Sequence, residues 1–411
     1  MASLSLEIMN YQLHIFNPGH ETAILQGVPN YTPPSNVQRM IKELAYLPIW
    51  YAQPEDFVYT EEIVSPRFIS LLPKEFKPFA TILSREILER KGREELPILK
   101  ALPWGLSPHS IHFFKKLQKK YNLQISIPEW RNEYIQLTSR ETAVQCLKLI
   151  REIIPNTIPL PTPAKICKEL REIEKYLMLQ NAPFILKAPF SSSGRGLYWL
   201  YERKLTTKDR IWIEGVLKKQ GSISIEPALD KQQDFAMEFY SNGKGEVFYE
   251  GLSVFGANKK GVYAGNKLGN QHYLESFFIE HFGESFQQIK EAVQISLKKL
   301  YGSIYVGYLG VDMLVFHTKD GHLAIHPCIE INMRYTMGMV ALRISQKYLS
   351  DNARGDMHIT YENKTGEAYK HHCFMKKAYP LEIINGKIKE GYLSLCPVTK
   401  ETQYRAYILV F

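Results

Sequence analysis

The spacing of apolar residues divides the first part of the chain into short strands and helices. Three apolar runs predict strands, at 11–16, 44–52 and 78–83. Helical spacing predicts helices over 84–102 and 107–123. In the second helix, Ser107 suits the N-cap and Pro108 the first helical position. Strands that alternate with helices predict an open α/β sheet for this region.

A second pattern, with longer helices and more strands, begins near residue 136. A helix is predicted over 138–155 with Ser139 as its N-cap, although Thr142 makes the capping box imperfect. Two more helices are predicted, over 168–180 and 285–302. Five strands are predicted, at 183–190, 197–202, 222–229, 234–241 and 245–255. Three more follow near the end, at 377–385, 391–398 and 404–411, and we expect them to close the sheet or form a small cap.

The pair Asp320-Gly321, which lies between two apolar runs, predicts a β-hairpin. If these two residues form the whole turn, Asp312 lies opposite residue 329, one place from Glu330. Pro327 interrupts the second strand and is expected to disturb this register, because proline cannot donate to a strand ladder.

The hairpin is unusual because it brings acidic and amide side chains together. Alternation along the second strand puts Glu330, Asn332 and Arg334 on one face. Two facing carboxylates repel each other unless a cation lies between them. Oxygen ligands from Asp, Glu and Asn suit Mg²⁺ with bound phosphate rather than zinc, and Arg334 is suited to a phosphoryl group. An ordinary hairpin, in which Arg334 neutralises one carboxylate, remains the alternative.

The stretch PFILKAPFSSSGRGL (183–197) joins a buried strand to a run of Ser and Gly. Its composition fits either a flexible linker or a loop whose backbone N–H groups hold phosphates. Lys187 at the end of the strand needs a partner if it is buried, or else extends to the surface. The stretch itself does not decide between these interpretations.

The net charge of +9 indicates an anionic partner or simply a solvated basic surface. Nucleic acid is not expected, because the basic residues form no dense block and no nucleic-acid motif. No membrane helix or signal peptide is expected either, since apolar runs of 18 residues are lacking and the start has no leader pattern. The cysteines are scattered without a CxxC pair, which indicates a reducing cytoplasm rather than zinc or disulfides.

Taken together in order, several segments make the chain resemble the ATP-grasp enzymes over residues 136–350. These segments are the "SR" at 139–140, the strand lysine of FILKAPFSSSGRGL, the acidic SIEPALDKQQDFAMEF, GYLGVD and EINMR. The resemblance implies an α/β domain over 1–135, an ATP-grasp domain of two subdomains (136–222 and 223–350) and a β-rich C-terminal segment over 351–411. A P-loop is excluded because GxxxxGK[ST] does not occur in the sequence, and the lack of GxGxxG argues against a dinucleotide enzyme.

The resemblance also implies roles for individual residues. Arg140, where the family usually has a lysine, and Lys187 would bind ATP phosphates. The phosphate loop would consist of Ser191, Ser192, Ser193, Gly194, Arg195 and Gly196. Glu226 and Leu229 would bind adenine, and Asp234 would bind the ribose.

For the metal, the resemblance implies Asp312, Glu330 and Asn332 as ligands of Mg²⁺, with Mn²⁺ as another cation that would fit. Arg334 and Lys187 would be catalytic, by neutralising the charge of the acyl phosphate or tetrahedral state.

Substrate contacts are less defined. His20 and Glu21 follow the first strand, where α/β sheets bind ligands, although a capping turn explains them equally well. Lys267, with Lys259 and Lys260, lies where the family often has a loop over the substrate, and a solvated loop is the alternative.

These expectations define a Mg-ATP-dependent carboxylate–amine ligase. ATP would phosphorylate a small anionic carboxylate, and an amine or other nucleophile would displace the phosphate. A phosphotransferase on the same scaffold and a nucleotide-binding protein without turnover are the alternatives. We expect a cytoplasmic protein, with a homodimer as one possible assembly.

Overall fold

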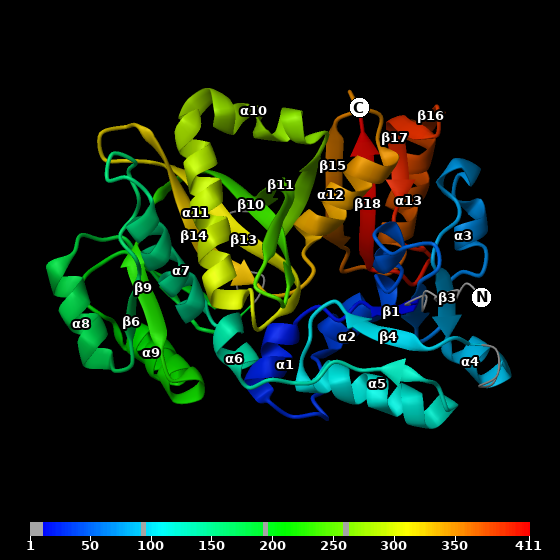
Figure 1. The fold of residues 1–411 in the computed structure, drawn as a ribbon, viewed down its shortest axis with the longest axis horizontal. Helices are drawn as coiled ribbons and strands as arrows, with labels where there is room; N and C mark the ends of the chain where they lie inside the picture. Colours follow the sequence, from blue (N-terminus) through cyan, green and yellow to red (C-terminus); the bar gives the residue numbers. More distant parts are fainter. Residues whose placement is uncertain (1–10, 92–95, 192–195, 258–262) are drawn as a thin grey trace, which may run out of the picture. The chain divides into compact units, whose positions relative to one another are not determined.

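The computed structural model describes residues 11–91, 96–191, 196–257 and 263–411 (Figure 1). The chain divides into two compact units. Unit 1 contains residues 1–130 and 359–409, and unit 2 contains residues 131–358 and the last two residues. No helix in the described ranges combines the length and the apolar character needed to span a membrane.

Unit 1 contains a five-stranded parallel sheet with the order β3-β2-β1-β4-β5. Its strands are β1 (Tyr11–Ile15), β2 (Phe57–Thr60), β3 (Thr81–Ser84), β4 (Leu99–Pro103) and β5 (Ile125–Ser126). The helices of this region are α1 (His20–Gln26), α2 (Ser35–Glu43), α3 (Phe68–Leu71), α4 (Arg85–Lys91) and α5 (Pro108–Tyr121). Leu13, Leu99 and Phe114 are buried in the core. The prediction of an open α/β sheet is therefore confirmed.

Helix α5 begins as predicted. The Ser107 hydroxyl accepts a hydrogen bond from the Ser110 N–H (3.1 Å), and the Ser107 N–H donates to the Ser110 hydroxyl (2.9 Å). Ser110 thus takes the place that Glu or Gln has in the usual capping box. Pro108 occupies the first turn, where its missing N–H costs nothing.

Two predictions for the N-terminal part of unit 1 are wrong. Residues 44–52 form turns and a 3₁₀ helix (η1, Leu47–Trp50) instead of a strand. The run is apolar because it is buried on all sides, and such a run has no period that separates strand from helix. Only the first part of the predicted helix over 84–102 is helical, as α4 (Arg85–Lys91). Its last residues, after Pro97, belong to strand β4 instead. A short 3₁₀ helix, η2 (Lys74–Phe76), precedes β3.

The C-terminal part of unit 1 contains α13 (Glu367–Ala378), β16 (Glu382–Ile384), β17 (Lys387–Ser394) and β18 (Tyr404–Val410). Helix α13 was not expected from the sequence pattern, and it takes the start of the predicted strand 377–385. This part packs within unit 1: Trp50 Nε1 donates to the Leu395 carbonyl (2.7 Å), and a Glu43 carboxylate oxygen accepts from the Tyr404 N–H (2.7 Å). That the segment closes or caps the ATP-grasp domain stays a prediction, as do the expected domain limits.

Unit 2 contains two antiparallel sheets. The small sheet has the order β6-β9-β7-β8. Its strands are β6 (Lys165–Cys167), β7 (Phe184–Lys187), β8 (Leu197–Leu200) and β9 (Ile223–Pro227). Helices α8 (Leu170–Leu179) and α9 (Thr207–Gln220) share its core, in which Ile173, Phe184 and Ile213 are buried. This arrangement agrees with the strands and the helix predicted over 168–229.

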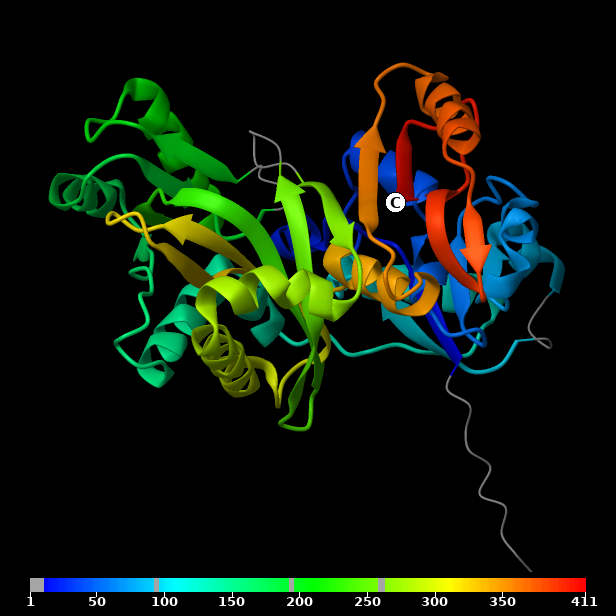
Figure 2. The same cartoon turned by 90° about the horizontal axis from the view of Figure 1, so that it is seen from above.

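The large sheet has the order β14-β13-β10-β11-β12, and β12 pairs with the start of β15. Its strands are β10 (Asp230–Asn242), β11 (Val247–Ala257), β12 (Tyr263–Leu268), β13 (Val306–His317), β14 (Leu323–Asn332) and β15 (Gly355–Tyr361). The helices of this region are α6 (Glu133–Thr138), α7 (Arg140–Ile153), α10 (Gln271–Phe282), α11 (Glu284–Tyr301) and α12 (Met337–Tyr348). Helices α10 and α11, yellow-green in Figure 2, pack against this sheet.

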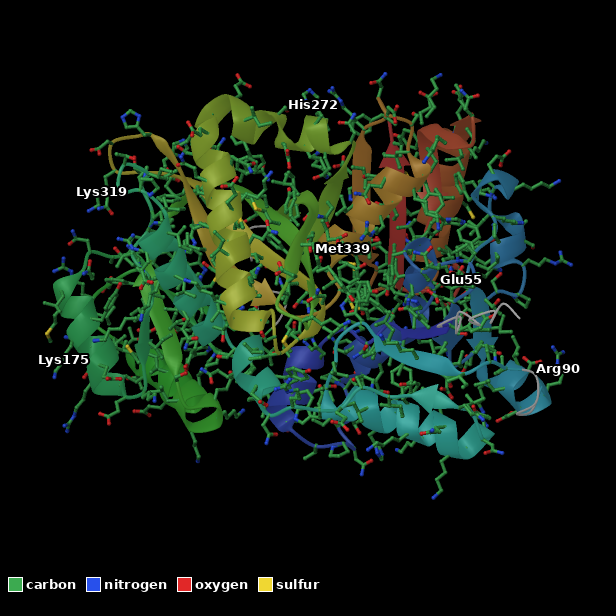
Figure 3. All side chains as sticks on the ribbon, viewed as in Figure 1. Glu55, Arg90, Lys175, His272, Lys319 and Met339 are labelled. Atoms are coloured by element: carbon green, nitrogen blue, oxygen red, sulfur yellow. The ribbon has the colours of Figure 1, made fainter. Side chains whose placement is uncertain are left out.

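The β13–β14 hairpin has a longer turn than predicted. The Thr318 N–H donates to the His322 carbonyl (2.8 Å), so three residues form the loop. Gly321 in this loop has φ 80°, the left-handed conformation that a three-residue hairpin loop requires. Lys319 at the tip is exposed, and its side chain points away from the strands (Figure 3).

A β-bulge on β14 changes the register of the hairpin. Leu314 pairs with His326, but two residues earlier Asp312 pairs with Glu330 instead of residue 328. The extra residues include Pro327. This agrees with the expected disturbance, because proline cannot donate to the strand ladder. The bulge therefore places two carboxylates directly opposite each other, one residue from the position that the simple register rule predicts.

Helix α12 begins beside a fully buried acid. Glu238 on β10 accepts hydrogen bonds from the hydroxyls of Ser253 (3.1 Å) and Thr336 (2.9 Å). A Cβ atom built on Gly338, in the first turn of α12, would overlap a Glu238 carboxylate oxygen and the Ser253 hydroxyl. The lack of a side chain at Gly338 thus lets the helix approach the acid closely.

We predict that Gly338→Ala destabilises unit 2 by about 2 kcal/mol, because the added methyl overpacks a site whose neighbours are fixed by hydrogen bonds. Gly215→Ala is the matched control. Gly215 lies inside α9 with open space around its Cβ position, so alanine there should stabilise by about 0.5–1 kcal/mol. Urea unfolding of both variants measures the difference, and equal stabilities would contradict the packing described for Gly338.

Candidate functional site

The four residues of the predicted acidic site meet at the end of the β13–β14 hairpin. Asp312 lies opposite Glu330, and the Asn332 side chain is hydrogen-bonded to Asp312. Arg334 Nη2 donates to Asn332 Oδ1 (2.8 Å), and its Nη1 donates to the Tyr335 carbonyl (3.1 Å). Asp312, Asn332 and Arg334 therefore form one connected network, with Glu330 facing it.

The two carboxylates are electrostatically unfavourable for each other. Burial, then the charges of Glu330 and Glu238, raise the pKa of Asp312 to about 8, although Arg334 acts in the opposite direction. A cation between the carboxylates would remove this repulsion. The described residues contain no group of three or more His, Cys, Asp or Glu side chains placed to hold a metal. Two carboxylates and one amide nonetheless form an oxygen donor set of the kind that suits Mg²⁺.

Arg140, the first residue of α7, connects the acidic hairpin to the serine loop. Its Nη2 donates to Glu330 Oε2 (2.9 Å), and its Nη1 donates to the Ala188 carbonyl (2.7 Å) and the Ser191 hydroxyl (2.6 Å). Its side chain is only 5% exposed. The guanidinium thus lies between Glu330 and Ser191, the first serine of the loop.

Lys187 ends β7 and forms an ion pair with Glu226 on the neighbouring strand β9. The residue is buried, so it does not extend to the surface. Burial works against the ionisation of Glu226, but the positive charges of Lys187 and Arg140 outweigh it and lower the pKa of this carboxyl. A buried cation with one carboxylate partner is well placed to bind a second anion.

A small cavity of about 10 Å³ lies between these groups. Its polar lining consists of Arg140, Lys187, Ser224, Glu226, His326 and Cys328. Its apolar lining consists of Val144, Leu147, Ala164 and Ile329. Three of the sequence-predicted ATP-binding residues therefore surround one cavity inside unit 2. At this volume it has room for about one water molecule, so a nucleotide requires it to open further.

The remaining predicted ATP contacts are only partly described. Gly196 lies beside Ser191, whose side chain would overlap a Cβ atom at Gly196, so the loop closes tightly there. Residues 192–195, which include the predicted Ser192, Ser193, Gly194 and Arg195, lie outside the described residues. Leu229 lies in the link between β9 and β10 and is partly buried, and Asp234 forms an ion pair with Lys231 (2.5 Å). Neither lines the cavity, and their nucleotide roles stay predictions.

The predicted substrate residues lie elsewhere in the chain. His20 is buried in unit 1 against Gly105, where an added Cβ would overlap its ring, and Glu21 beside it is nearly as buried. Both side chains are thus buried near the ends of β1 and β4, and their substrate roles stay predictions. Lys267 is half-exposed and pairs with Asp356 (2.9 Å). Lys259 and Lys260 lie outside the described residues.

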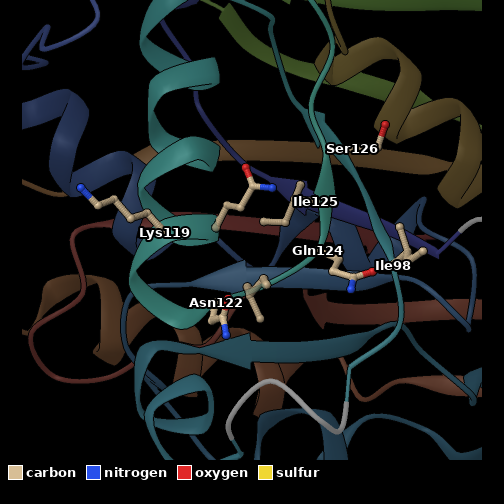
Figure 4. Close-up of a pocket in the computed structure, with 8 residues that line it drawn as sticks. Ile98, Lys119, Asn122, Gln124, Ile125 and Ser126 are labelled. Atoms are coloured by element: carbon tan, nitrogen blue, oxygen red, sulfur yellow. The ribbon is translucent and has the colours of Figure 1, made fainter.

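An open hollow of about 630 Å³ lies on the surface of unit 1, at the end of α5 and along β5 (Figure 4). Ile98, Lys119, Asn122 and Gln124 are among its lining residues. It contains none of the residues predicted to carry chemistry, and its mixed, shallow lining offers no converging charges.

Two residues at the site were missed by sequence reasoning. Glu238 lies two residues along β10 from Ala236, the partner of Asp312, and contributes to the raised pKa of Asp312. His326 lines the cavity from β14. The available signals were an acid within the apolar stretch FAMEFY (235–240) and a histidine within LAIHP (323–327), but the side chains around both come largely from other elements.

The fold, with two antiparallel sheets in unit 2 and a parallel sheet in unit 1, is similar to that of solved biotin carboxylases. Biotin carboxylase from Campylobacter jejuni, solved as a β-γ-ATP complex, has this fold at 12% identity and a TM-score of 0.52, with 98% of this chain and 88% of that chain covered. The biotin carboxylase domain dimer of 2-oxoglutarate carboxylase from Hydrogenobacter thermophilus, solved with MgADP, ADP and bicarbonate, has 12% identity and a TM-score of 0.50 over 97% of this chain and 86% of that one.

These likenesses show the fold alone, given the low identities. No protein-family model matches the chain. No curated protein matches it significantly either.

We predict that Asp312→Asn stabilises the ligand-free protein by about 1–2 kcal/mol, because an amide does not repel Glu330. The folded wild type keeps the Asp312 proton up to a pKa of about 8, while the unfolded chain loses it near the ordinary value of 3.8. Wild-type stability therefore falls as pH rises between these two values, and the asparagine variant is spared that loss.

Thermal unfolding between pH 5 and pH 9 checks this prediction. The advantage of Asp312→Asn should grow up to about pH 8 and then level off. Asp320→Asn in the exposed turn is the control and should show no such trend. A variant less stable than wild type throughout this range would contradict the repulsion between the two carboxylates.

Proposed function

We propose that the protein is a Mg-ATP-dependent ligase that activates a carboxylate as an acyl phosphate for attack by an amine or other nucleophile. The observation that carries the proposal is the meeting of Asp312, Glu330, Asn332 and Arg334 at one hairpin end, with Arg140 joining it to the serine loop. The ATP-grasp fold supports the same reaction class.

Asp312, Glu330 and Asn332 would hold Mg²⁺, and Mn²⁺ has compatible ligand preferences. The bound cation would supply charge neutralisation at the phosphates. Its arrival would offset the repulsion that raises the pKa of Asp312, so this carboxyl would bind as a carboxylate. The unfavourable carboxylate pair is thereby explained as a preorganised metal site.

Arg140 and Lys187 would change partners when ATP binds. Without nucleotide, they neutralise Glu330 and Glu226. With nucleotide, Arg140 would donate to a phosphate and release Glu330 toward the metal, and Lys187 would donate to a second phosphate while its stem stays buried. Because both cations are held by carboxylates in advance, little rearrangement is needed to present them.

Arg334 would stabilise the charge that develops during transfer. Its guanidinium is held by Asn332 and the Tyr335 carbonyl, which fixes the direction of its remaining donors. A planar fork of donors suits the oxygens of an acyl phosphate or a tetrahedral intermediate. Arg334 and Lys187 are therefore the residues that we assign to catalysis.

The other roles follow the sequence resemblance. Glu226 and Leu229 would contact adenine, Asp234 the ribose, and residues 191–196 the outer phosphates. His20, Glu21 and Lys267 remain candidate substrate contacts, for a small anionic carboxylate and its nucleophile. The expected limits 1–135, 136–350 and 351–411 remain our proposal for the domains.

We also propose a cytoplasmic protein, which the five cysteines support because all are free. A homodimer remains part of the proposal, and gel filtration with light scattering tests it.

The reaction class is tested by a screen for ADP release with Mg-ATP across amino acids, dipeptides and small dicarboxylates, with mass spectrometry of the product. The proposal expects ADP and free phosphate in equal amounts, together with an amide or related condensation product. ADP with a stable phosphorylated product would indicate a phosphotransferase instead. ATP binding without any product would indicate a binding protein.

We predict that Lys187→Ala lowers kcat/KM for ATP by about 10²–10³-fold, because it removes a preorganised donor and leaves Glu226 as an unpaired buried charge. Lys208→Ala, at an exposed position of α9 in the same unit, is the matched control and should leave kcat/KM unchanged. Steady-state kinetics with circular dichroism as a folding check make the comparison. A folded Lys187→Ala protein with wild-type ATP kinetics would contradict the assignment.

A further inference from the structure

His326 is a polar cavity-lining residue of unit 2 to which the proposed reaction gives no role. It lies on β14 and is 3% exposed. Its Nε2 atom is buried and has no hydrogen-bond partner among the residues that the structure describes. His326 lines the same cavity as Lys187 and Glu226, the two residues to which the proposed function assigns nucleotide contacts.

The hydrogen bonding of His326 indicates which tautomer it adopts. The Cys328 N–H donates to His326 Nδ1 (3.3 Å), so Nδ1 is the acceptor and Nε2 carries the hydrogen of a neutral ring. Burial lowers the pKa of His326 to about 4, and Lys187 acts in the same direction while Glu226 opposes it. At neutral pH the ring is therefore a fixed, uncharged N–H donor.

An unpaired buried donor is unfavourable without a ligand, because it has lost its hydrogen bonds to water. The neighbouring lining residues Val144, Leu147 and Ile329 are apolar, so packing alone would be satisfied better by an apolar side chain at position 326. The donor therefore has a use only when an acceptor enters the cavity. A single ordered water is one such acceptor, and a ligand atom is another.

The charges around His326 distinguish between ligand atoms. Glu226 carries a negative charge at the cavity and accepts hydrogen bonds, whereas His326 Nε2 donates one. An exocyclic amine beside an unprotonated ring nitrogen is complementary to this pair, and adenine has that arrangement. Guanine presents a carbonyl oxygen in place of the amine, and on its N1 edge it also has a protonated ring nitrogen in place of the acceptor.

We propose that His326 is a specificity-determining residue that donates a hydrogen bond from Nε2 to a ring nitrogen of the adenine base. This inference rests on the proposed function, because it assigns the cavity to the base of ATP. The cavity must widen as the base enters, and the hydrogen bond to His326 replaces the donor's missing partner. Rejection of guanine then comes from a carbonyl facing Glu226 and, where the contact is to N1, also from an unpaired buried donor.

Calorimetric titration of the full-length protein with Mg-ATP, without a carboxylate substrate, tests this assignment. His326→Phe keeps a ring but removes the donor, and its Kd for ATP should rise about tenfold. His326→Gln keeps an N–H donor near the same place and should restore much of the affinity. His322→Phe, at an exposed position of the same hairpin, is the control and should bind like wild type.

Deaza analogues identify the base atom. ATP analogues that lack one ring nitrogen, 1-deaza-ATP and 7-deaza-ATP, replace an acceptor with C–H. The wild-type protein should bind one of these analogues about tenfold more weakly than ATP. His326→Phe should bind that analogue and ATP equally well, since its donor is already gone. The preference of the wild type for ATP over GTP should also shrink in His326→Phe.

The outcomes separate this inference from the proposed function. If the wild-type protein binds no ATP, both fail. If it binds ATP but His326→Phe leaves Kd, the ATP/GTP ratio and the analogue pattern unchanged, only the role of His326 fails, and the cavity holds water instead. If His326→Phe does not fold, His326→Gln and the analogue series on the wild type still decide, because equal affinities for ATP and both analogues would overturn the hydrogen bond.

Discussion

The repulsion between Asp312 and Glu330 is the interaction around which the rest of unit 2 is arranged. A β-bulge at Pro327 places these carboxylates opposite each other, and the surroundings compensate with Arg334 through Asn332 and with Arg140 on Glu330. Folding alone would be served better by removing one acid. Its presence is explained if the site exists to receive a cation, so that part of the stability of the ligand-free protein is given up for binding.

The same principle extends to the small sheet. Lys187 and Glu226 form a buried ion pair beside a cavity, and His326 adds a neutral donor that has no hydrogen-bond partner in the described part of the chain. Each group is only partly satisfied within the protein, and each lies where an anionic or hydrogen-bonding ligand would complete its interactions. In the absence of ligand the cations neutralise the acids, which keeps the site ordered. Arg140 contacts Glu330 and Ser191 together, so it links the metal side of the site to the phosphate side.

Much of the fold and part of the site could be predicted from the sequence. Strand β1 and helix α5 were predictable because their signals are local: an apolar run, and a serine cap followed by proline. Residues 44–52 were not, because burial on every side leaves an apolar run without a diagnostic period. Asp312 and Glu330 could be placed only within one residue, since a bulge adds residues that the hairpin rule does not count. Glu238 and His326 were missed because their meaning depends on neighbours from other strands.

The central claim is that Asp312, Glu330 and Asn332 form a cation site completed by nucleotide. Its most direct test is a titration of Mn²⁺, followed by electron paramagnetic resonance, with and without ATP. Because Arg140 holds Glu330 in the ligand-free protein, the account predicts that the protein alone binds Mn²⁺ weakly. With ATP present, the protein should bind Mn²⁺ at least tenfold more tightly, and more tightly than ATP alone does. Mn²⁺ affinity that ATP does not change, or that Asp312→Asn leaves intact, would contradict it.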